Sequence, residues 1–173
     1  MKMTARVVTL VVLACGLAAV SVRAQQSSDA ARVRAQLIGS YKLISYVSYD
    51  ANGAPTTLPY SVGQISYDAA GRMSAHLMRS GRPRLTTPGA PEAERAAAFG
   101  TYIAYFGAYT IDADKHTVTH HVEGAMNPNM VGSNLVRHYE FSPDGKSLFL
   151  SVKDGERLTG KLQWDRNEPG LRP

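Results

Sequence analysis

The sequence predicts an all-β protein: an eight-stranded antiparallel up-and-down β-barrel, with a short N-terminal helix and one helix between strands three and four. Segments rich in β-branched and aromatic residues recur at short, regular spacing, and turn signals separate most of them. Eight is also the strand number at which a closed barrel has room for side chains or one small ligand. Closure removes exposed strand edges without disulfides. An open or split sheet is the alternative.

The first 24 residues are predicted to be a signal peptide that is not part of the domain. Lys2 and Arg6 form a positive start, residues 7–22 are apolar, and a small-residue cleavage site ends at Ala24. We therefore expect an exported protein, periplasmic or secreted after cleavage near Ala24. A lipid anchor at Cys15 is disfavoured, because the residues that follow this cysteine stay apolar.

Removal of this leader changes what the charge and the cysteine count imply. Its basic residues, Lys2, Arg6 and Arg23, account for a fall in formal charge from +5 to +2. No basic stripe with interleaved aromatic residues remains, so nucleic acid is not an expected partner. Cys15 is the only cysteine, and the mature chain therefore lacks disulfides, zinc thiolates and a cysteine nucleophile.

The N-terminal half is predicted to contain a short helix and three strands. Residues 25–36 form a linker and helix that Ser28 can cap and that ends before Gly39. Turn residues at 50–53 and 68–71 separate the strands, and Pro55 and Pro59 mark a loop. The three strands are predicted over residues 41–49, 62–68 and 72–78.

The C-terminal half is predicted to contain one helix and five strands. A basic loop over residues 79–91 leads into a helix over 92–104, which begins with acidic residues as the helix dipole favours. We expect this loop and helix to cover or gate the barrel mouth. The five strands are predicted over residues 105–112, 116–123, 134–141, 147–152 and 157–165. The barrel domain then spans residues 37–166, and residues 167–173 form a disordered tail.

Alternation along each strand predicts which side chains point inward. Val118, His120 and Val122 form the apolar face of one strand, so His120 points inward and His121 outward. Arg137 lies on the apolar face of the next strand by the same rule. The strand that contains residue 73 is ambiguous, because both of its faces contain apolar residues. The side chains predicted to line a cavity and bind a ligand are Met73, Tyr105, Tyr109, His120, Arg137 and Tyr139.

Each of these polar residues also has a purely structural interpretation. A buried histidine often completes a hydrogen-bond network in the core. Arg137 could pair with a carboxylate such as Glu123, and the tyrosines could serve packing alone. If the protein is an enzyme, His120 is the candidate base beside a tyrosine, either Tyr105 or Tyr109. Gly107 would leave space between the two tyrosines of its strand.

Neither a metal site nor a cofactor site is predicted. His120 and His121 are adjacent and point to opposite faces, so they cannot chelate one ion from a regular strand. His116 shares a face with His120 but lies about 13 Å away along an extended strand. The sequence also lacks a nucleophile elbow, a phosphate loop and a dinucleotide fingerprint, so no catalytic residue is assigned.

Several short motifs together resemble the lipocalin-like domain family of bacteria and fungi. They are residues 37–45 (LIGSYKLIS), 71–75 (GRMSA), 105–109 (YFGAY), 119–124 (THHVEG) and Arg137. The resemblance covers residues 37–166 and implies a calycin-type β-barrel with a small-molecule cavity. Some fungal relatives are associated with secondary-metabolite pathways, so the resemblance also implies ring-forming or isomerising activity as an alternative.

Two departures limit what this resemblance implies for individual residues. True lipocalins begin with Gly-x-Trp, whereas Tyr41 stands in the aromatic position here, and the disulfide of secreted lipocalins is absent. Residues that bind retinoids or haem in classical members are therefore not transferred. His120 and Arg137 match positions of the family pattern, and they are the only site residues that the resemblance implies here.

The leading hypothesis is an exported lipocalin-like protein that binds a small, mostly apolar molecule, which Arg137 would allow to be anionic. One alternative is an isomerase or cyclase that uses a histidine–tyrosine pair in the same cavity. Another is a structural or interaction barrel, which an interior cavity below about 300 Å³ would favour. A binding protein is favoured over an enzyme, with a small molecule as partner and no membrane span.

Overall fold

The computed structural model describes residues 25, 27–57, 60–86 and 89–167. The expected signal peptide, Cys15 and residues 168–173 of the expected tail lie outside this part of the chain. No helix within the described residues is both long enough and apolar enough to cross a membrane.

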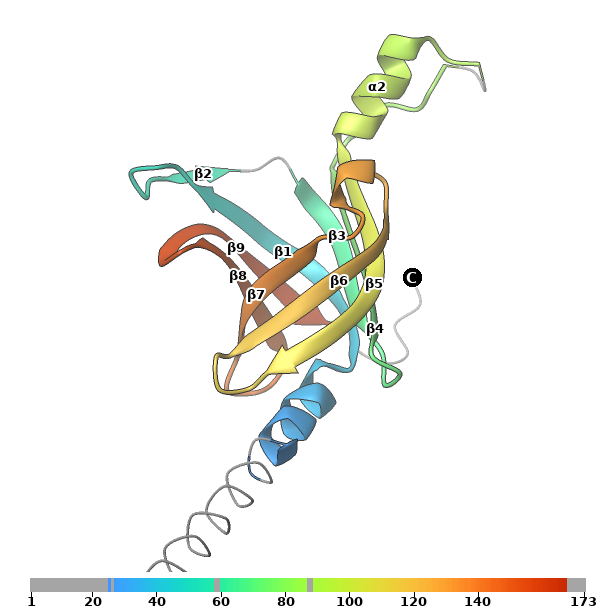
Figure 1. Ribbon diagram of the computed structural model, residues 1–173. Helices are drawn as coiled ribbons and strands as arrows, with labels where there is room; N and C mark the ends of the chain where they lie inside the picture. Colours follow the sequence, from blue (N-terminus) through green and yellow to red (C-terminus); the bar gives the residue numbers. More distant parts are fainter. Residues whose placement is uncertain (1–24, 26, 58–59, 87–88, 168–173) are drawn as a thin grey trace, which may run out of the picture.

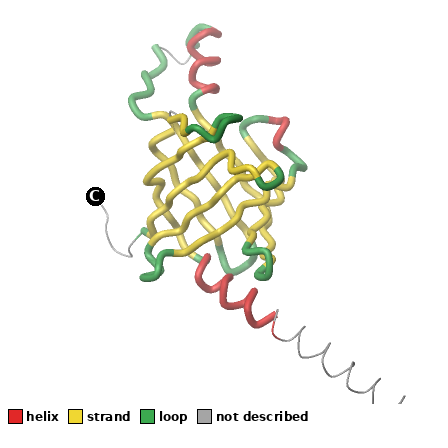
Figure 2. Tube along the Cα trace, turned by 90° about the vertical axis from the view of Figure 1, so that its left-hand side faces the viewer, coloured by secondary structure: helices red, strands yellow, loops and turns green. Residues whose placement is uncertain are grey.

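Within the described residues, eight antiparallel strands close into a barrel, as predicted (Figures 1 and 2). Neighbours in sequence are neighbours in the barrel, and the last strand pairs with the first. A short additional strand, β2 (Pro55–Thr57), pairs with the end of β1 in a segment predicted to be a loop. The barrel strands are β1 (Gly39–Tyr49), β3 (Tyr60–Tyr67), β4 (Arg72–Arg79), β5 (Tyr102–Asp112), β6 (Thr117–Ala125), β7 (Asn134–Phe141), β8 (Ser147–Asp154) and β9 (Arg157–Arg166).

Strand β1 closes the barrel, because it pairs with β3 on one side and with β9 on the other. Leu43 lies opposite Trp164 of β9, and both are buried. A β-bulge between Leu43 and Ser45 then shifts the register, so that Tyr46 lies opposite Leu162 and continues the inward face. An extra residue in one strand reverses the alternation beyond it.

The barrel interior contains one hydrophobic core. On β4, Met73, Ala75 and Leu77 are each no more than 5% exposed, which settles the ambiguity of that strand. Cross-strand pairs continue the same face into the neighbours, for example Ala75 opposite Ile65 of β3 and opposite Tyr105 of β5. Each large side chain of this kind contributes about 1.5–3 kcal/mol by leaving water.

The helix over residues 27–37 covers one end of the barrel and is drawn in blue in Figure 1. Leu37, its last residue, has no exposed surface. Arg166 of β9 donates hydrogen bonds to the carbonyl oxygens of Gln36 and of Ile38, the latter at 2.8 Å. These carbonyls are among those that a helix end leaves unsatisfied. The last strand therefore holds the helix against the barrel.

The second helix, α2 (Glu92–Gly100), ends four residues earlier than predicted. Tyr102 and Ile103 instead pair with Met78 and Leu77 of β4 and so extend β5. None of the residues of α2 is buried, and Figure 1 shows it projecting beyond the end of the barrel. The structure therefore does not show the expected cover over the barrel mouth.

Candidate functional site

His120 lies in the barrel interior with both ring nitrogens in hydrogen bonds. Its side chain has no exposed surface. The hydroxyl of Tyr67, on β3, lies 2.7 Å from Nε2, and the hydroxyl of Tyr105, on β5, lies 3.1 Å from Nδ1. A neutral imidazole has one N–H and one bare nitrogen, so it donates to one hydroxyl and accepts from the other. We call Tyr67, His120 and Tyr105 the Tyr–His–Tyr chain.

Burial keeps this chain uncharged at neutral pH. Loss of hydration lowers the pKa of His120 to about 3, and repulsion from Arg137 and His121 adds to the effect. Burial raises the pKa of Tyr67 well above its ordinary value and also raises the pKa of Tyr105. The positive charge of Arg137 partly opposes the shift at Tyr105.

Arg137 lies beside the Tyr–His–Tyr chain, on the inward face of β7. It is opposite Val118 of β6, which has no exposed surface, and its side chain lines the interior cavity. Within the described part of the chain, no carboxylate forms an ion pair with Arg137. Glu123, the partner considered from the sequence, faces outward and binds Arg72 through two contacts of 2.6 Å. The guanidinium of Arg137 donates to the carbonyl oxygen of the neighbouring Val136 at 3.0 Å, and no carboxylate among the described residues neutralises its charge.

A cavity of about 140 Å³ adjoins Tyr105 and Arg137 in the half of the barrel nearer to α2. The rest of its lining is apolar or aromatic: Tyr46, Ile65, Ala75, Leu77, Ile103, Met130, Leu150, Val152, Leu162 and Trp164. An apolar cavity of about 150 Å³ binds benzene, whereas sites for drug-sized ligands begin near about 300 Å³. The cavity thus has room for a small ring or a short chain, and its volume of about 140 Å³ is below the limit of about 300 Å³ under which the structural or interaction barrel was expected.

Trp164 contributes an unusual polar group to the wall of this cavity. The residue is 1% exposed, and its indole N–H has no hydrogen-bond partner among the described residues. A buried donor without a partner costs about 1–3 kcal/mol, so such donors are rare. An acceptor atom of a ligand or a water molecule is therefore a candidate partner for this N–H.

The structure brings three of the six predicted ligand-binding residues together. Tyr105 and Arg137 line the cavity, and His120 is hydrogen-bonded to the hydroxyl of Tyr105. Met73, although buried on the inward face of β4, is not part of the cavity lining.

The other two predicted residues lie away from the cavity. The hydroxyl of Tyr109 donates to the carbonyl oxygen of Asp68 at 2.9 Å, so Tyr109 is not the tyrosine that bonds His120. Its ring packs edge-on against Tyr67 with 5.1 Å between centroids. Tyr139 stacks on His116 at 5.7 Å. Of the two tyrosines considered beside His120, Tyr105 is hydrogen-bonded to its imidazole and Tyr109 is not.

Several residues of the site were not predicted from the sequence, for different physical reasons. Tyr67 and Trp164 follow Ile65 and Leu162 by strict alternation, so the same rule that placed His120 inside would have found both. The bulge in β1 conceals Tyr46, because alternation from Leu43 points Ser45 inward instead. Ile103 was assigned to a helix, and Met130 belongs to an irregular connection with a short 3₁₀ helix, η1 (Pro128–Met130).

Gly107 has a role different from the expected one. A Cβ atom at this position would lie 1.8 Å from the carbonyl oxygen of His121 on the neighbouring strand. The register of β5 and β6 shifts between Phe106 and Gly107, and the two backbones approach closely there. Gly107 is thus required by the bulge, and not by the space between the tyrosines.

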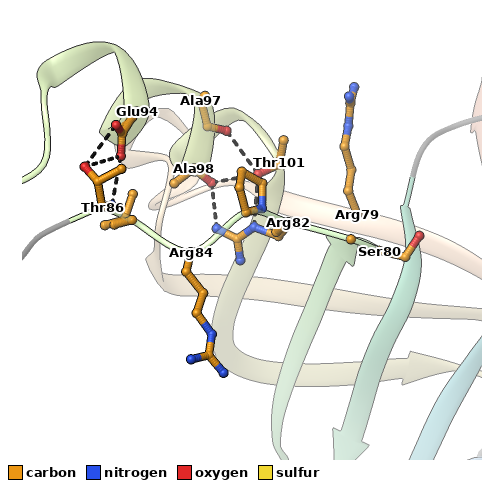
Figure 3. A pocket seen from close by; sticks show the side chains of 12 residues that line it. Arg79, Ser80, Arg82, Arg84, Thr86, Glu94, Ala97, Ala98 and Thr101 are labelled. Carbon is orange, nitrogen blue, oxygen red and sulfur yellow. Dashed lines mark hydrogen bonds between the residues drawn. The ribbon is translucent and has the colours of Figure 1, made fainter.

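A larger hollow of about 470 Å³ lies outside the barrel, between residues 79–86 and α2 (Figure 3). Arg82 is fully engaged there: it donates to the carbonyl oxygen of Ala98 at 2.9 Å and to the hydroxyl of Thr101 at 3.1 Å. Arg79 and Arg84 extend in opposite directions in Figure 3, so they do not converge on one ligand. The barrel cavity, where polar groups do converge, is the better candidate site.

The barrel part of the chain matches a known protein family. A family model described as a lipocalin-like domain matches residues 38–167. No curated protein has a matching sequence. Among solved structures, a redesigned β-barrel is similar with a TM-score of 0.40 and 9% sequence identity, over 78% of this chain and 95% of that one.

Proposed function

Because the chain belongs to the lipocalin-like domain family, we propose that its barrel binds a small, mostly apolar molecule that carries an anionic group. Arg137 is the observation that carries the proposal. Its guanidinium lines a largely apolar cavity and has no carboxylate partner among the described residues. A guanidinium offers two parallel N–H groups that match a carboxylate.

The surroundings of Arg137 fit a carboxylate ligand in two further respects. The hydroxyl of Tyr105 lines the same cavity, and its bond to His120 fixes its position. Apolar walls lower the local dielectric, which strengthens a charge-assisted hydrogen bond inside the barrel. Export remains part of the proposal and rests on the basic and apolar pattern of residues 1–24.

The proposal is tested by the binding of benzoate and of benzyl alcohol, a neutral compound of similar size. The chain has one tryptophan, Trp164, which lines the cavity and so provides a fluorescence signal. Wild type should bind benzoate more tightly. Arg137→Met should weaken benzoate binding by roughly 10- to 100-fold, the effect of one charge-assisted hydrogen bond. Arg72→Met, on the outer face, should bind both compounds like wild type.

Two outcomes would contradict the proposal. If Arg137→Met and wild type bind benzoate equally, the guanidinium is not the anchor. If wild type binds neither compound, the small cavity favours the structural barrel with a filled core.

The enzyme alternative receives little support from the geometry of His120. Both of its ring nitrogens are hydrogen-bonded, its side chain has no exposed surface, and its pKa is lowered to about 3. A general base needs access to its substrate and a pKa nearer the working pH. His120 therefore positions Tyr105 and does not itself reach a ligand.

A further inference from the structure

A second hollow adjoins the barrel cavity at the end nearer to α2. Its volume is about 290 Å³, twice that of the cavity. Ile103 of β5 and Met130 of η1 line both spaces, so these two side chains stand between them. The remaining lining residues of this outer hollow are Tyr60, Phe99, Gly100, Tyr102, Ala104, Met126 and Asn127.

The lining of the outer hollow is mostly apolar and uncharged, unlike that of the cavity. No charged residue lines it, whereas Arg137 lines the cavity. Phe99 of α2 is 48% exposed beside it, on a helix without buried residues. Arg82 lies 5.3 Å from the ring of Tyr102, but its guanidinium is used by the end of α2. An anionic group therefore has its partner inside the barrel and not in the outer hollow.

The side chain of Met130, at the junction of the cavity and the outer hollow, can change conformation to let a longer ligand pass. Met130 is unbranched and has three rotatable bonds, and methionine adapts to irregular gaps more readily than other apolar residues. The cavity alone holds only a small ring or a short chain. A ligand that also fills the outer hollow would bury several more methylene groups.

We propose that the ligand is a single-chain carboxylate whose head binds Arg137 inside the barrel and whose apolar tail passes between Ile103 and Met130 into the outer hollow, against Phe99. The inference rests on the proposed function for its head group and adds a tail subsite outside the barrel. In this arrangement α2 contributes to the binding site without covering the mouth.

A series of saturated carboxylates tests the tail subsite. Hexanoate and decanoate, each below its micelle-forming concentration, are titrated against the protein and followed by calorimetry or by the fluorescence of Trp164. Each methylene that leaves water adds about fourfold to the affinity. We therefore expect decanoate to bind at least tenfold more tightly than hexanoate. Phe99→Ala should remove about five- to tenfold of the decanoate affinity and change hexanoate less than twofold.

Phe106→Ala is the matched control. Phe106 is 54% exposed on β5, but it covers Gly124 and does not line the outer hollow. This variant should keep the wild-type preference for decanoate. If the protein binds benzoate or hexanoate but gains nothing from the longer chain, the tail subsite alone is overturned. The same holds if the preference for decanoate is undiminished in Phe99→Ala. No binding of benzoate, hexanoate or decanoate overturns the proposed function itself.

Discussion

Tyr67 and His120 share a hydrogen bond of 2.7 Å inside the barrel, although their strands are not neighbours. Strands β4 and β5 lie between β3 and β6 in the sheet, so the bond spans the interior. Tyr105 bonds the other ring nitrogen of His120 and also lines the cavity. The position of a cavity hydroxyl thus depends on a residue of β3.

Acid should destabilise the protein through His120. In the unfolded chain this residue takes up a proton near pH 6.5, whereas in the folded protein it does so only near pH 3. Its contribution to stability is therefore complete above pH 6.5 and is lost as the pH falls toward 3. At pH 4.5 the loss amounts to about 2–3 kcal/mol.

Urea unfolding of His120→Gln and wild type at pH 7 and pH 4.5 measures this contribution. In His120→Gln, the free energy of unfolding should fall less between pH 7 and pH 4.5 than it does in wild type. This holds whatever the stability of the variant at pH 7. His121→Gln, on the outer face, should keep the wild-type difference. Equal differences in wild type and His120→Gln would contradict the buried neutral histidine.

Removal of either tyrosine hydroxyl of the Tyr–His–Tyr chain should lower stability, but only one of the two removals should weaken ligand binding. Tyr67→Phe and Tyr105→Phe each leave one nitrogen of His120 without a partner, which costs about 1–3 kcal/mol. Tyr105→Phe should also weaken benzoate binding severalfold, because only Tyr105 lines the cavity. Denaturant unfolding and ligand titration of both variants check this. A comparable loss of affinity in Tyr67→Phe would show that the hydroxyl of Tyr105 does not act through direct contact with the ligand.

Gly107→Ala should be strongly destabilising. Its Cβ would lie 1.8 Å from the backbone oxygen of His121, so the strands must separate at the bulge. We expect a loss of at least about 2–3 kcal/mol in the free energy of unfolding. Gly100→Ala is the control, since no atom lies within 4 Å of its added Cβ. Thermal unfolding of the two variants should differ by several degrees, and similar melting temperatures would refute the close approach.

Arg166→Lys should loosen the end of the barrel that the N-terminal helix covers. The guanidinium donates to the carbonyl oxygens of Gln36 and Ile38 and lies 4.7 Å above the ring of Tyr41. A lysine ammonium cannot make all of these contacts, so we expect a loss of about 2 kcal/mol. Arg157→Lys, whose ion pair with Asp154 is exposed, should change stability by less than about 0.5 kcal/mol. Hydrogen exchange of residues 27–37 would show directly whether the helix is released.

The strands could be predicted because alternation and turn residues are local properties. Val118 and Val122 place His120 inside without any knowledge of the other strands. The identity of its partners is not a local property. Tyr67, Tyr105 and Tyr109 all point inward, and only the register of β3, β5 and β6 decides which hydroxyls reach the imidazole.

Two other features lay beyond a prediction from alternation for physical reasons. The bulge in β1 turns Tyr46 inward by adding one residue to the strand, and no nearby residue type marks it. The end of α2 depends on the pairing of Tyr102 and Ile103 with β4, a tertiary contact that overrides helix propensity. The volume of the cavity likewise follows from side chains of almost every strand.

Closure of the barrel by β1 and β9 has a consequence for how the protein forms. Tyr41 and Arg166 are 125 positions apart, so the last strand must be present before the first has both of its neighbours. Such long-range pairing gives slow folding, in the range of milliseconds to seconds for β-barrels of this kind. Until β9 is in place, β1 and β8 each expose a row of unpaired backbone groups. A chain that is cut before residue 157 would therefore keep two open edges and should aggregate.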